Sequence, residues 1–285
     1  EEALCGGPAA RTLPLIETLS GDATIAHATA YSHVFEALAG GGAPPRAQAL
    51  RALALELERL ACHIGDLGAL AGDVGFLPTA SFCGRIRGDF LNMTALLCGS
   101  RFGRGLVRPG GTGFDVDAAR VADLERRLDA GERDATVAIR LLLENQSVLA
   151  RFEEVGPLPR TVATELGIVG PAARASGLDR DSRRDQPLGA WREAAVAVAT
   201  AEAGDVLARA MIRWQEIGHS LAFIRSLLRA LPSGPVLAPQ APLAPGCLAV
   251  ALVEGWRGEV CHVGITDAGG RFARYKVVDP SFHNW

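Results

Sequence analysis

Aromatic residues, long apolar runs and an excess of one charge are all scarce in this sequence of 285 residues. Aromatic side chains make up 6% of the chain, and alanine and leucine are abundant, so most of the chain is predicted to be helical. No window of about 18 uninterrupted apolar residues is present, and no helix is therefore expected to span a bilayer. The net charge of −3, with both signs mixed, argues against a nucleic-acid-binding face.

Paired cysteine motifs are also absent. The six cysteines form no C-x-x-C pattern and are scattered along the chain at Cys5, Cys62, Cys83, Cys98, Cys247 and Cys261. Scattered cysteines without a secretion signal predict a reducing, cytoplasmic location. The chain begins with Glu1 rather than Met and ends at Trp285 inside a strand-like region, so we expect it to be a fragment of a longer chain.

Apolar periodicity is what the sequence does contain, and an apolar content of 48% is enough for a sizeable core. From Leu50 to Leu67, leucine and isoleucine recur at alternating steps of three and four residues, which draws one apolar seam on a helix. A polar row runs beside this seam at the same spacing, formed by Glu56, Arg59, His63 and Asp66. Residues 45–75 therefore predict a core helix that begins at a proline.

Glycines at helical spacing follow this polar row, and Asp73 lies among them. They are Gly65, Gly68, Gly72 and Gly75. Their missing side chains let another backbone or a bound group come close to the helix. We therefore expect groups able to do chemistry near this end of the helix.

Further helices are predicted at 22–39, 80–99, 115–152, 161–166 and 203–231, with a break at Gly131. The last of these carries a seam like that of residues 45–75, so the two helices should face each other in a bundle. The simplest interpretation of His27 and His33, on the first of these helices, is that of structural histidines.

Two polar segments lie between the predicted helices. Residues 101–115 are rich in arginine and glycine and offer donors to an anion or a carboxylate, but they match neither a P-loop nor a dinucleotide fingerprint. Residues 170–187 alternate Arg and Asp densely. They form either a solvent loop or the polar lining of an interior site.

The apolar period changes near the C-terminal end. Residues 248–280 show a two-residue alternation around a Gly269-Gly270 turn, which predicts antiparallel strands. The sequence thus predicts a mainly α fold, with a helical bundle core and inserted loops at 1–242. A small antiparallel β segment at 243–285 should pack on this bundle.

Four stretches together resemble one protein family. They read ELERLACH at 56–63, DVG at 73–75, RASGLDRDSRRDQP at 174–187 and GEVCHVGITDAGGRFARYKVVDPSFHNW at 258–285. Their order and spacing resemble the large subunit shared by complex I, where it is the D-type subunit of NADH-quinone oxidoreductase, and nickel–iron hydrogenases. The similarity extends in particular to the energy-converting, formate hydrogenlyase-like branch. It implies an α-helical bundle core with small β elements.

Hydrogenase members of this family hold a nickel–iron centre with two cysteine pairs, the first in an R-x-C-G-x-C motif. When the sequences are aligned on the A-H at 26–27, Ser20 and Ala23 stand at those two thiolate positions. The second pair would fall beyond Trp285, and Cys5 does not rebuild the first. The resemblance therefore predicts no metal site and no nickel-dependent hydrogenase activity.

Complex I members of the family reduce quinone in the equivalent cavity, using a Tyr at the start of this helix and a His from an N-terminal strand domain. The Tyr position falls on Gly21, and the region of that His is not in this chain. Asp73 matches the family acid in L-D-x-G, and the polar row matches E-x-x-R-x-x-x-H. The resemblance implies cavity-lining positions at Ser20, Gly21, Asp22, Arg108, Arg174, Asp181 and Arg183.

From the resemblance we expect an oxidoreductase subunit, active only in a complex, that takes part in electron transfer from an iron–sulfur partner to quinone with proton coupling. The expected catalytic groups are His27, Asp73, Glu56, Arg59 and His63. The expected partners are an iron–sulfur small subunit and membrane subunits, on the cytoplasmic face of the inner membrane, without nucleic acid. This chain is expected to hold no metal or cluster itself, with quinone as the candidate ligand and NAD bound only by another subunit.

Two alternatives stay open. A catalytically silent paralogue, serving as a scaffold or assembly subunit, would also lack the thiolates at Ser20 and Ala23 and the Tyr at Gly21, and it could keep buried charges for structural reasons. A cysteine or metallo-hydrolase would need convergent groups, but Cys62 and His63 are adjacent on a helix and point in different directions.

Overall fold

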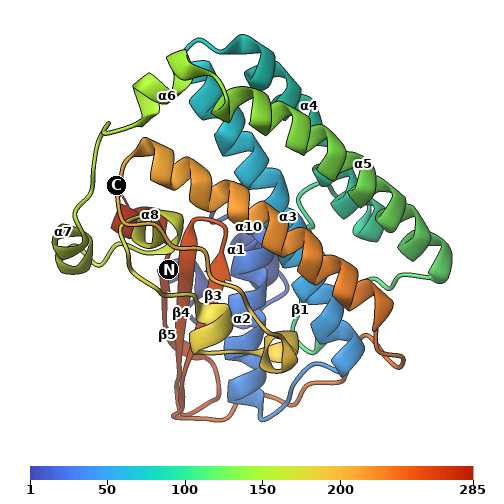
Figure 1. Cartoon of the computed structure of the whole chain (residues 1–285). Coiled ribbons are helices and arrows are strands. Elements are labelled where there is room, and N and C mark those ends of the chain that lie inside the picture. Colours follow the sequence, from blue (N-terminus) through green and yellow to red (C-terminus); the bar gives the residue numbers. More distant parts are fainter. Residues whose placement is uncertain (285) are drawn as a thin grey trace.

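The computed structural model describes residues 1–284, and two long helices lie at its centre (Figure 1). They are α3 (Pro45–Asp73) and α10 (Val206–Arg229), which pack against each other. Pro45 takes the first position of α3, where its missing N–H loses no helical hydrogen bond. The side chain of Asp205 accepts a hydrogen bond from the Ala208 N–H and so caps α10. The predicted pairing of these two helices is confirmed.

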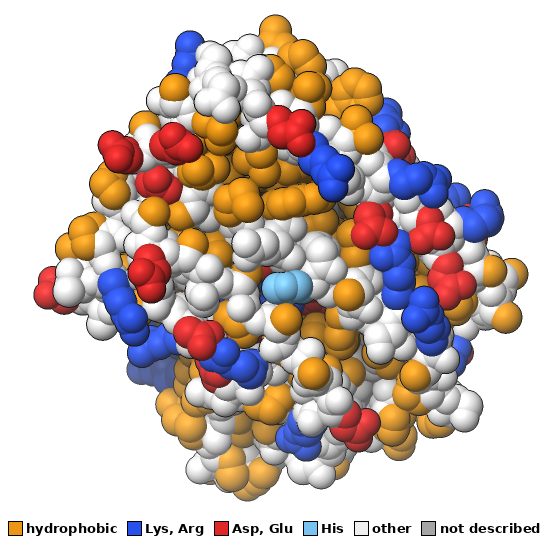
Figure 2. All heavy atoms as spheres, viewed as in Figure 1, with side chains coloured by type: hydrophobic (Ala, Val, Ile, Leu, Met, Phe, Trp, Pro, Cys, Tyr) orange, Lys and Arg blue, Asp and Glu red, His pale blue; other side chains and the backbone are white. Residues whose placement is uncertain are grey.

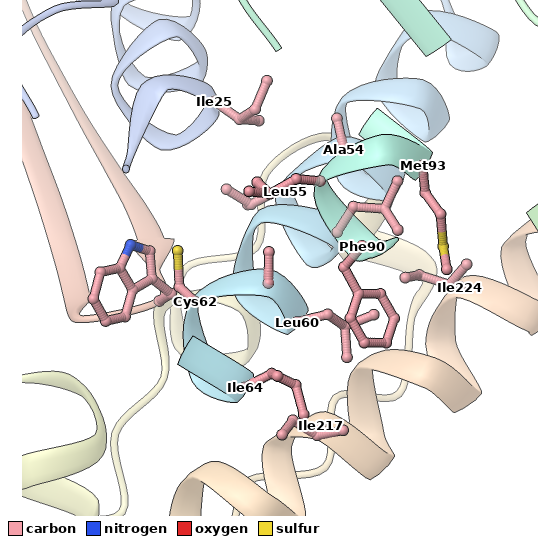
Figure 3. Close-up of a cluster of buried hydrophobic side chains, with 14 of the residues drawn as sticks. Ile25, Ala54, Leu55, Leu60, Cys62, Ile64, Phe90, Met93, Ile217 and Ile224 are labelled. Atoms are coloured by element: carbon pink, nitrogen blue, oxygen red, sulfur yellow. The ribbon is translucent and has the colours of Figure 1, made fainter. Parts of the chain in front are cut away.

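The apolar seam of α3 forms the centre of the core. Figure 3 shows Leu60 and Ile64 of α3 beside Phe90 of α4 (Leu77–Cys98) and Ile217 of α10. The fully buried members of the seam are Leu53, Leu57, Leu60, Ile64 and Leu67. Complete burial of such side chains stabilises the fold by about 1.5–3 kcal/mol each.

The glycines of α3 allow α4 to run back along it at close range. A Cβ added to Gly68 would lie only 2.6 Å from the Cβ of Cys83, and one added to Gly65 would lie 2.9 Å from the Cδ of Arg87. These two glycines therefore accommodate a neighbouring helix, one of the two roles expected for them.

Helix α5 (Ala118–Leu143) continues through Gly131, so the break predicted at that residue is wrong. The ring of Phe90 packs on Gly131, where an added Cβ would sit 3.0 Å from the ring. The chain instead breaks at Asn145, whose side chain accepts two backbone N–H groups and caps a separate helix, α6 (Gln146–Phe152).

Helix α2 (Thr24–Ala39) supports a three-stranded sheet near the C-terminal end. Strands β3 (Leu248–Gly255), β4 (Gly258–Thr266) and β5 (Phe272–Val278) pair antiparallel in the order β3-β4-β5. In the turn between β4 and β5, the carboxylate of Asp267 accepts two backbone N–H groups. The predicted mainly α class with antiparallel strands is confirmed, whereas the domain boundary between 1–242 and 243–285 stays a prediction.

Shorter elements connect these parts. They are η1 (Glu2–Leu4), α1 (Thr12–Ile16), β1 (Val107–Arg108), β2 (Gly111–Thr112), α7 (Arg160–Glu165), α8 (Gly170–Ala175), α9 (Ser182–Asp185), η2 (Gly189–Glu193) and α11 (Ser281–Asn284). Across residues 1–284, none of the helices has both the length and the apolar character that crossing a membrane requires.

Charged side chains of both signs alternate along the side of the molecule that α5 occupies (Figure 2). Arg85 of α4 pairs with Asp89 and Asp134, and Arg225 of α10 pairs with Glu132. Such surface pairs contribute about 0–1 kcal/mol each. On this face the charges are balanced and do not gather into a basic patch.

Candidate functional site

A network of buried ionisable side chains lies where α3, α8, α9, α10 and β3 meet. None of its members is more than 6% exposed. They are Glu56, Arg59, His63, Arg174, Asp181, Arg183, Glu216 and Glu254. Buried charges are tolerated only when they are paired and hydrogen-bonded, and each of these groups contacts at least one of opposite charge or an imidazole.

The polar row of α3 forms one side of this network. Arg59 lies 3.3 Å from Glu56 and 3.4 Å from Glu216 of α10. The Nε2 atom of His63 lies 2.7 Å from the same Glu216 carboxylate. Ser220, one turn further along α10, donates to Glu56 over 2.5 Å. Three members of the row predicted from the sequence therefore meet in this network, whereas Asp66 pairs with Arg213 at 2.8 Å outside it. Arg59 and His63 share Glu216, a partner that no local sequence pattern indicates.

Part of residues 170–187 forms the other side of the network. Arg174, Asp181 and Arg183 are buried there, whereas the remaining charged residues of the segment, Asp179, Arg180, Arg184 and Asp185, are exposed to solvent. Arg174 donates to Glu216 over 2.8 Å and to Glu254 over 2.8 Å. Arg183 donates to Glu56 over 3.0 Å and contacts Asp181 at 2.6 Å. Three arginines thus tie four carboxylates from different elements together.

The arginines decide the ionisation of the carboxylates they contact. Burial alone would raise the pKa of Glu56, but the charges of Arg59 and Arg183 offset it and hold the pKa below its usual value. For Glu216 burial is likewise offset, chiefly by Arg174, and its pKa is well below the usual value. Burial opposes ionisation of Asp181 too, yet Arg183 lowers its pKa to about 2. These three groups are therefore carboxylates at neutral pH.

A second cluster joins α2 to the sheet and to the residue after β5. The Nδ1 atom of His27 lies 3.0 Å from Nε2 of His262, and Nδ1 of His262 lies 2.9 Å from the Tyr275 hydroxyl. On its other side, Nε2 of His27 lies 2.9 Å from the Asp279 carboxylate. His27 and His262 are fully buried, whereas the side chain of Asp279 is 26% exposed. This chain of four groups leads from the surface into the core.

One set of tautomers satisfies every link of this chain. Burial opposes ionisation of Asp279, but the bond from His27 and two bonds involving Ser281 lower its pKa, so Asp279 is a carboxylate that accepts the His27 Nε2–H. His27 Nδ1 then accepts from His262 Nε2–H, and His262 Nδ1 accepts from the Tyr275 O–H. If His27 gains a proton on Nδ1, His262 can switch tautomer and donate to the Tyr275 oxygen. The arrangement can thus accommodate one extra proton.

The start of α2 holds the other predicted site residues. Ser20 donates to the Asp22 carboxylate over 3.0 Å, and Arg257 binds the same carboxylate with two bonds of 2.8 Å. Gly21 is exposed, while Ala23 is 4% exposed and belongs to the core. Asp22 therefore fixes the entry into α2 rather than projecting into a large cavity.

A nickel centre does not fit these residues. Ser20 offers a hydroxyl and Ala23 a methyl group where thiolates would be needed. The nearest thiol at this place, Cys62, donates to the Asp22 carbonyl over 3.5 Å, and burial raises its pKa well above the usual value, which keeps it protonated. Within the part of the chain that the structure describes, no three His, Cys, Asp or Glu side chains are grouped so that they could hold a metal ion.

Asp73 and Arg108 join neither cluster, although they were expected to line one cavity with His27, Glu56 and His63. Asp73 is the last residue of α3, and its side chain is exposed because the helix reaches the surface there. Arg108 lies on β1 with an exposed side chain. Their placement therefore corrects that expectation, and a functional role for them stays a prediction.

Five of the clustered groups were not predicted from the sequence, namely Glu216, Glu254, His262, Tyr275 and Asp279. His262 lies between Val260 and Gly264 on the inward face of β4. The two-residue alternation of this strand in the sequence was therefore sufficient to predict that the His262 imidazole is buried. Glu216 has no such signal, because its partners come from segments distant in the sequence.

Comparison with known proteins agrees with this architecture. Residues 73–246 match the family model for the 49-kDa subunit of the respiratory-chain NADH dehydrogenase. The carbon monoxide-induced hydrogenase of Rhodospirillum rubrum is 32% identical over 278 residues, which cover 96% of this chain and 76% of that protein. A D-type subunit of the NADH-quinone oxidoreductase of Herpetosiphon aurantiacus is 30% identical over 281 residues, covering 96% and 76%. Subunit 4 of the NADH-quinone oxidoreductase of Thermus thermophilus is 30% identical over 288 residues, covering 92% and 70%. The chain belongs to the family of the 49-kDa subunit of respiratory-chain NADH dehydrogenase, which includes subunits of NADH-quinone oxidoreductases and a related hydrogenase.

Proposed function

We propose that this chain is the large-subunit component of a membrane-associated redox complex and takes part in electron transfer from an iron–sulfur partner to quinone with proton coupling. Membership of the 49-kDa subunit family supports the complex and the redox chemistry. The observation that carries the proton-coupling part is the hydrogen-bonded chain from Asp279 through His27 and His262 to Tyr275. Each imidazole has one nitrogen that can accept a proton while the other donates one, so these hydrogen-bonded groups can pass a proton along during turnover.

In this proposal the two clusters have different tasks. His27 exchanges the proton, and the partly exposed Asp279 holds the resulting imidazolium. The buried ion network holds α3, α8 and α10 in place relative to one another. Glu56, Arg59 and His63 are its members on α3. The positions proposed to face the quinone or a partner are Ser20, Gly21, Asp22, Asp73 and Arg108, whereas Arg174, Asp181 and Arg183 belong to the buried ion network.

The cofactors and partners follow from the same proposal. The iron–sulfur cluster resides in a small subunit, NAD is handled only through another subunit, and the complex lies on the cytoplasmic face of the inner membrane. A formate hydrogenlyase-like assembly is one form that this complex could take. In each case electrons reach this chain's site from a cluster outside it, since its own scattered cysteines suit none.

The test is quinone-dependent turnover of the purified, assembled complex carrying His27→Gln. We expect turnover to fall by about 10²-fold or more, because general acid–base groups contribute on that scale. His283→Gln is the matched control, because His283 lies on α11 (Ser281–Asn284), is partly exposed and belongs to neither cluster. Unchanged turnover in a fully assembled His27→Gln complex would remove His27 from the mechanism.

A second candidate is a catalytically silent scaffold or assembly subunit. The features that favour it are the hydroxyl and methyl groups at Ser20 and Ala23 and the exposed Gly21 at the position of the expected Tyr. A scaffold predicts that the complex falls apart without this chain, but that neither His27→Gln nor His283→Gln alters the turnover of the intact complex. The same pair of variants therefore separates the two functions.

A further inference from the structure

The buried ion network contains one carboxylate more than its arginines can balance. Its cations are the guanidinium groups of Arg59, Arg174 and Arg183. Against these three stand four carboxyl groups, which belong to Glu56, Asp181, Glu216 and Glu254. A lone excess charge in a desolvated site is costly, so the network should hold one additional proton.

His63 is not the group that holds this proton. Its Nε2 atom faces Glu216 at 2.7 Å, so the proton of a neutral imidazole sits there as a donor. Its Nδ1 atom is buried and has no hydrogen-bond partner. A second proton on Nδ1 would create a buried donor without an acceptor, and burial itself lowers the pKa of His63. The extra proton therefore belongs to a carboxyl group.

Glu254 is the carboxyl group with the fewest cationic contacts. Glu56 contacts both Arg59 and Arg183, and Glu216 contacts both Arg59 and Arg174. Asp181 is held by Arg183, with Arg174 at 3.7 Å.

By contrast, Glu254 accepts one guanidinium bond, from Arg174 at 2.8 Å, and one backbone bond, from the Ser182 N–H at 3.1 Å. Burial raises the pKa of Glu254, and the negative charge of Asp181 raises it further. Geometry and electrostatics thus agree on which carboxyl group is neutral.

A cavity of about 220 Å³ lies directly beside Glu254. One part of its wall is apolar, with Ile168, Val169 and Ala173, and another carries the polar groups Arg180, Asp181, Ser182, Asp185 and Glu259. The Ser182 hydroxyl donates to Glu259 over 3.1 Å and marks the boundary between cavity and network. Several water molecules fit in such a volume, since each occupies about 30 Å³ in the liquid.

We infer that Glu254 is the proton-binding site of the buried network and that water in this cavity delivers the proton to it and carries it away. The transfer is a simple exchange: a hydronium ion gives its proton to a Glu254 oxygen and becomes water, and the reverse step restores the carboxylate. The inference concerns the chain itself and holds whether or not quinone is the electron acceptor.

The groups that face Glu254 from each neighbouring element make the site responsive to its surroundings. Helix α8 supplies Arg174, and α3 supplies Arg59, which donates to the Glu254 carbonyl over 2.7 Å. Helix α9 and the loop before it supply Arg183 and Asp181. Helix α2 supplies His33, which lines a narrow gap on the other side of Glu254, and β4 supplies Glu259. Proton binding at Glu254 therefore depends on the charges of all these neighbouring groups.

The test is a pH titration of the carboxyl signals in the full chain with ¹³C-labelled glutamate, followed by NMR. We expect two glutamate side chains to remain protonated at pH 7. One signal disappears in Glu254→Gln, and the other disappears in Glu58→Gln, since burial raises the pKa of Glu58 to about 8. Glu165→Gln, a change of an exposed glutamate on α7, should leave both signals in place.

A companion measurement is the urea midpoint at pH 7. Glu254→Gln should keep the wild-type midpoint, because an amide resembles a neutral carboxyl group, whereas Glu216→Gln should lower it by removing a paired charge. The inference would be overturned if the signal that Glu58→Gln leaves in place disappeared in Glu216→Gln rather than in Glu254→Gln. A positively charged His63 at pH 7 would overturn it as well. If Glu254→Gln does not fold, the wild-type titration alone decides, because a single protonated glutamate at pH 7 would contradict the assignment.

Discussion

Replacing Arg59 by methionine tests whether the buried ion network is an energetic unit. The guanidinium of Arg59 is 1% exposed and contacts Glu56, Glu216 and two backbone carbonyls of β3, at distances from 2.7 to 3.4 Å. Methionine fills similar space but leaves both carboxylates short of a cation. Breaking a buried pair by removing one partner costs about 3–5 kcal/mol. Since domains are stable by only about 5–15 kcal/mol, Arg59→Met should lose about a fifth or more of the unfolding free energy.

The assay is urea unfolding followed by circular dichroism, with Arg85→Met as the matched control. Arg85 lies on the neighbouring helix α4, its side chain is 52% exposed, and it also contacts two carboxylates. Because surface pairs contribute about 0–1 kcal/mol, Arg85→Met should change the unfolding free energy by no more than that. Equal losses in the two variants would refute the view that the network is buried and coupled.

The loss of unfolding free energy caused by Arg59→Met should depend on pH in a definite direction. In the wild type the pKa values of Glu56 and Glu216 lie below the ordinary 4.5, so their contribution to stability is present above that pH and is lost as the pH falls through the folded values. Without Arg59 less of the effect of burial is offset, so both pKa values rise, although Arg183 still contacts Glu56 and Arg174 still contacts Glu216. The folded variant then loses less stability than the wild type on acidification. The deficit should therefore be largest at neutral pH and should shrink as the pH falls, and a deficit that grows on acidification would contradict this explanation.

Two further predictions concern single positions around α2. Burial raises the pKa of Glu58 to about 8, so the folded chain holds this proton between the unfolded value of 4.5 and about 8, and stability falls as the pH rises through this window. In Glu58→Gln the slope of unfolding free energy against pH should be less negative by up to about 1.4 kcal/mol per pH unit, and an unchanged slope would assign the titration to another group. Gly103 has φ of +71°, and an added Cβ would lie 2.2 Å from Cδ1 of Ile25, so Gly103→Ala should destabilise the chain by more than about 1–2 kcal/mol. Gly84→Ala, at an exposed position of α4 with open space, should instead be neutral or stabilising by up to about 1 kcal/mol in the same unfolding measurement. A larger loss of unfolding free energy in Gly84→Ala than in Gly103→Ala would contradict the close contact between Gly103 and Ile25.

The helical framework could be predicted because its signals are local. The seam of α3 repeats every three to four residues, and the glycines at its end mark where α4 approaches. The same logic failed at Gly131, because glycine is a weak helix former in isolation but fits where the Phe90 ring packs against α5. Tertiary packing overrode the local preference there.

The candidate site could be predicted only in part, because its groups meet across long sequence distances. The α3 row was visible from its spacing, but Glu216 contacts it from a helix about 150 residues later. Asp279 contacts His27 over a separation of 252 residues, and nothing in a local pattern around Asp279 indicates that contact. Asp73 shows the opposite error, since its position beside a buried row suggested burial that the end of the helix does not provide.

Elemental analysis of the affinity-purified, assembled complex decides whether this chain works in a redox assembly without nickel of its own. We expect iron, held as clusters by partner chains, together with essentially no nickel, because Ser20 and Ala23 cannot replace two thiolates and Cys62 is a buried, protonated thiol. A complex that contains this chain but no iron would contradict its place in a redox assembly. About one nickel per chain would contradict the interpretation of the site at the start of α2.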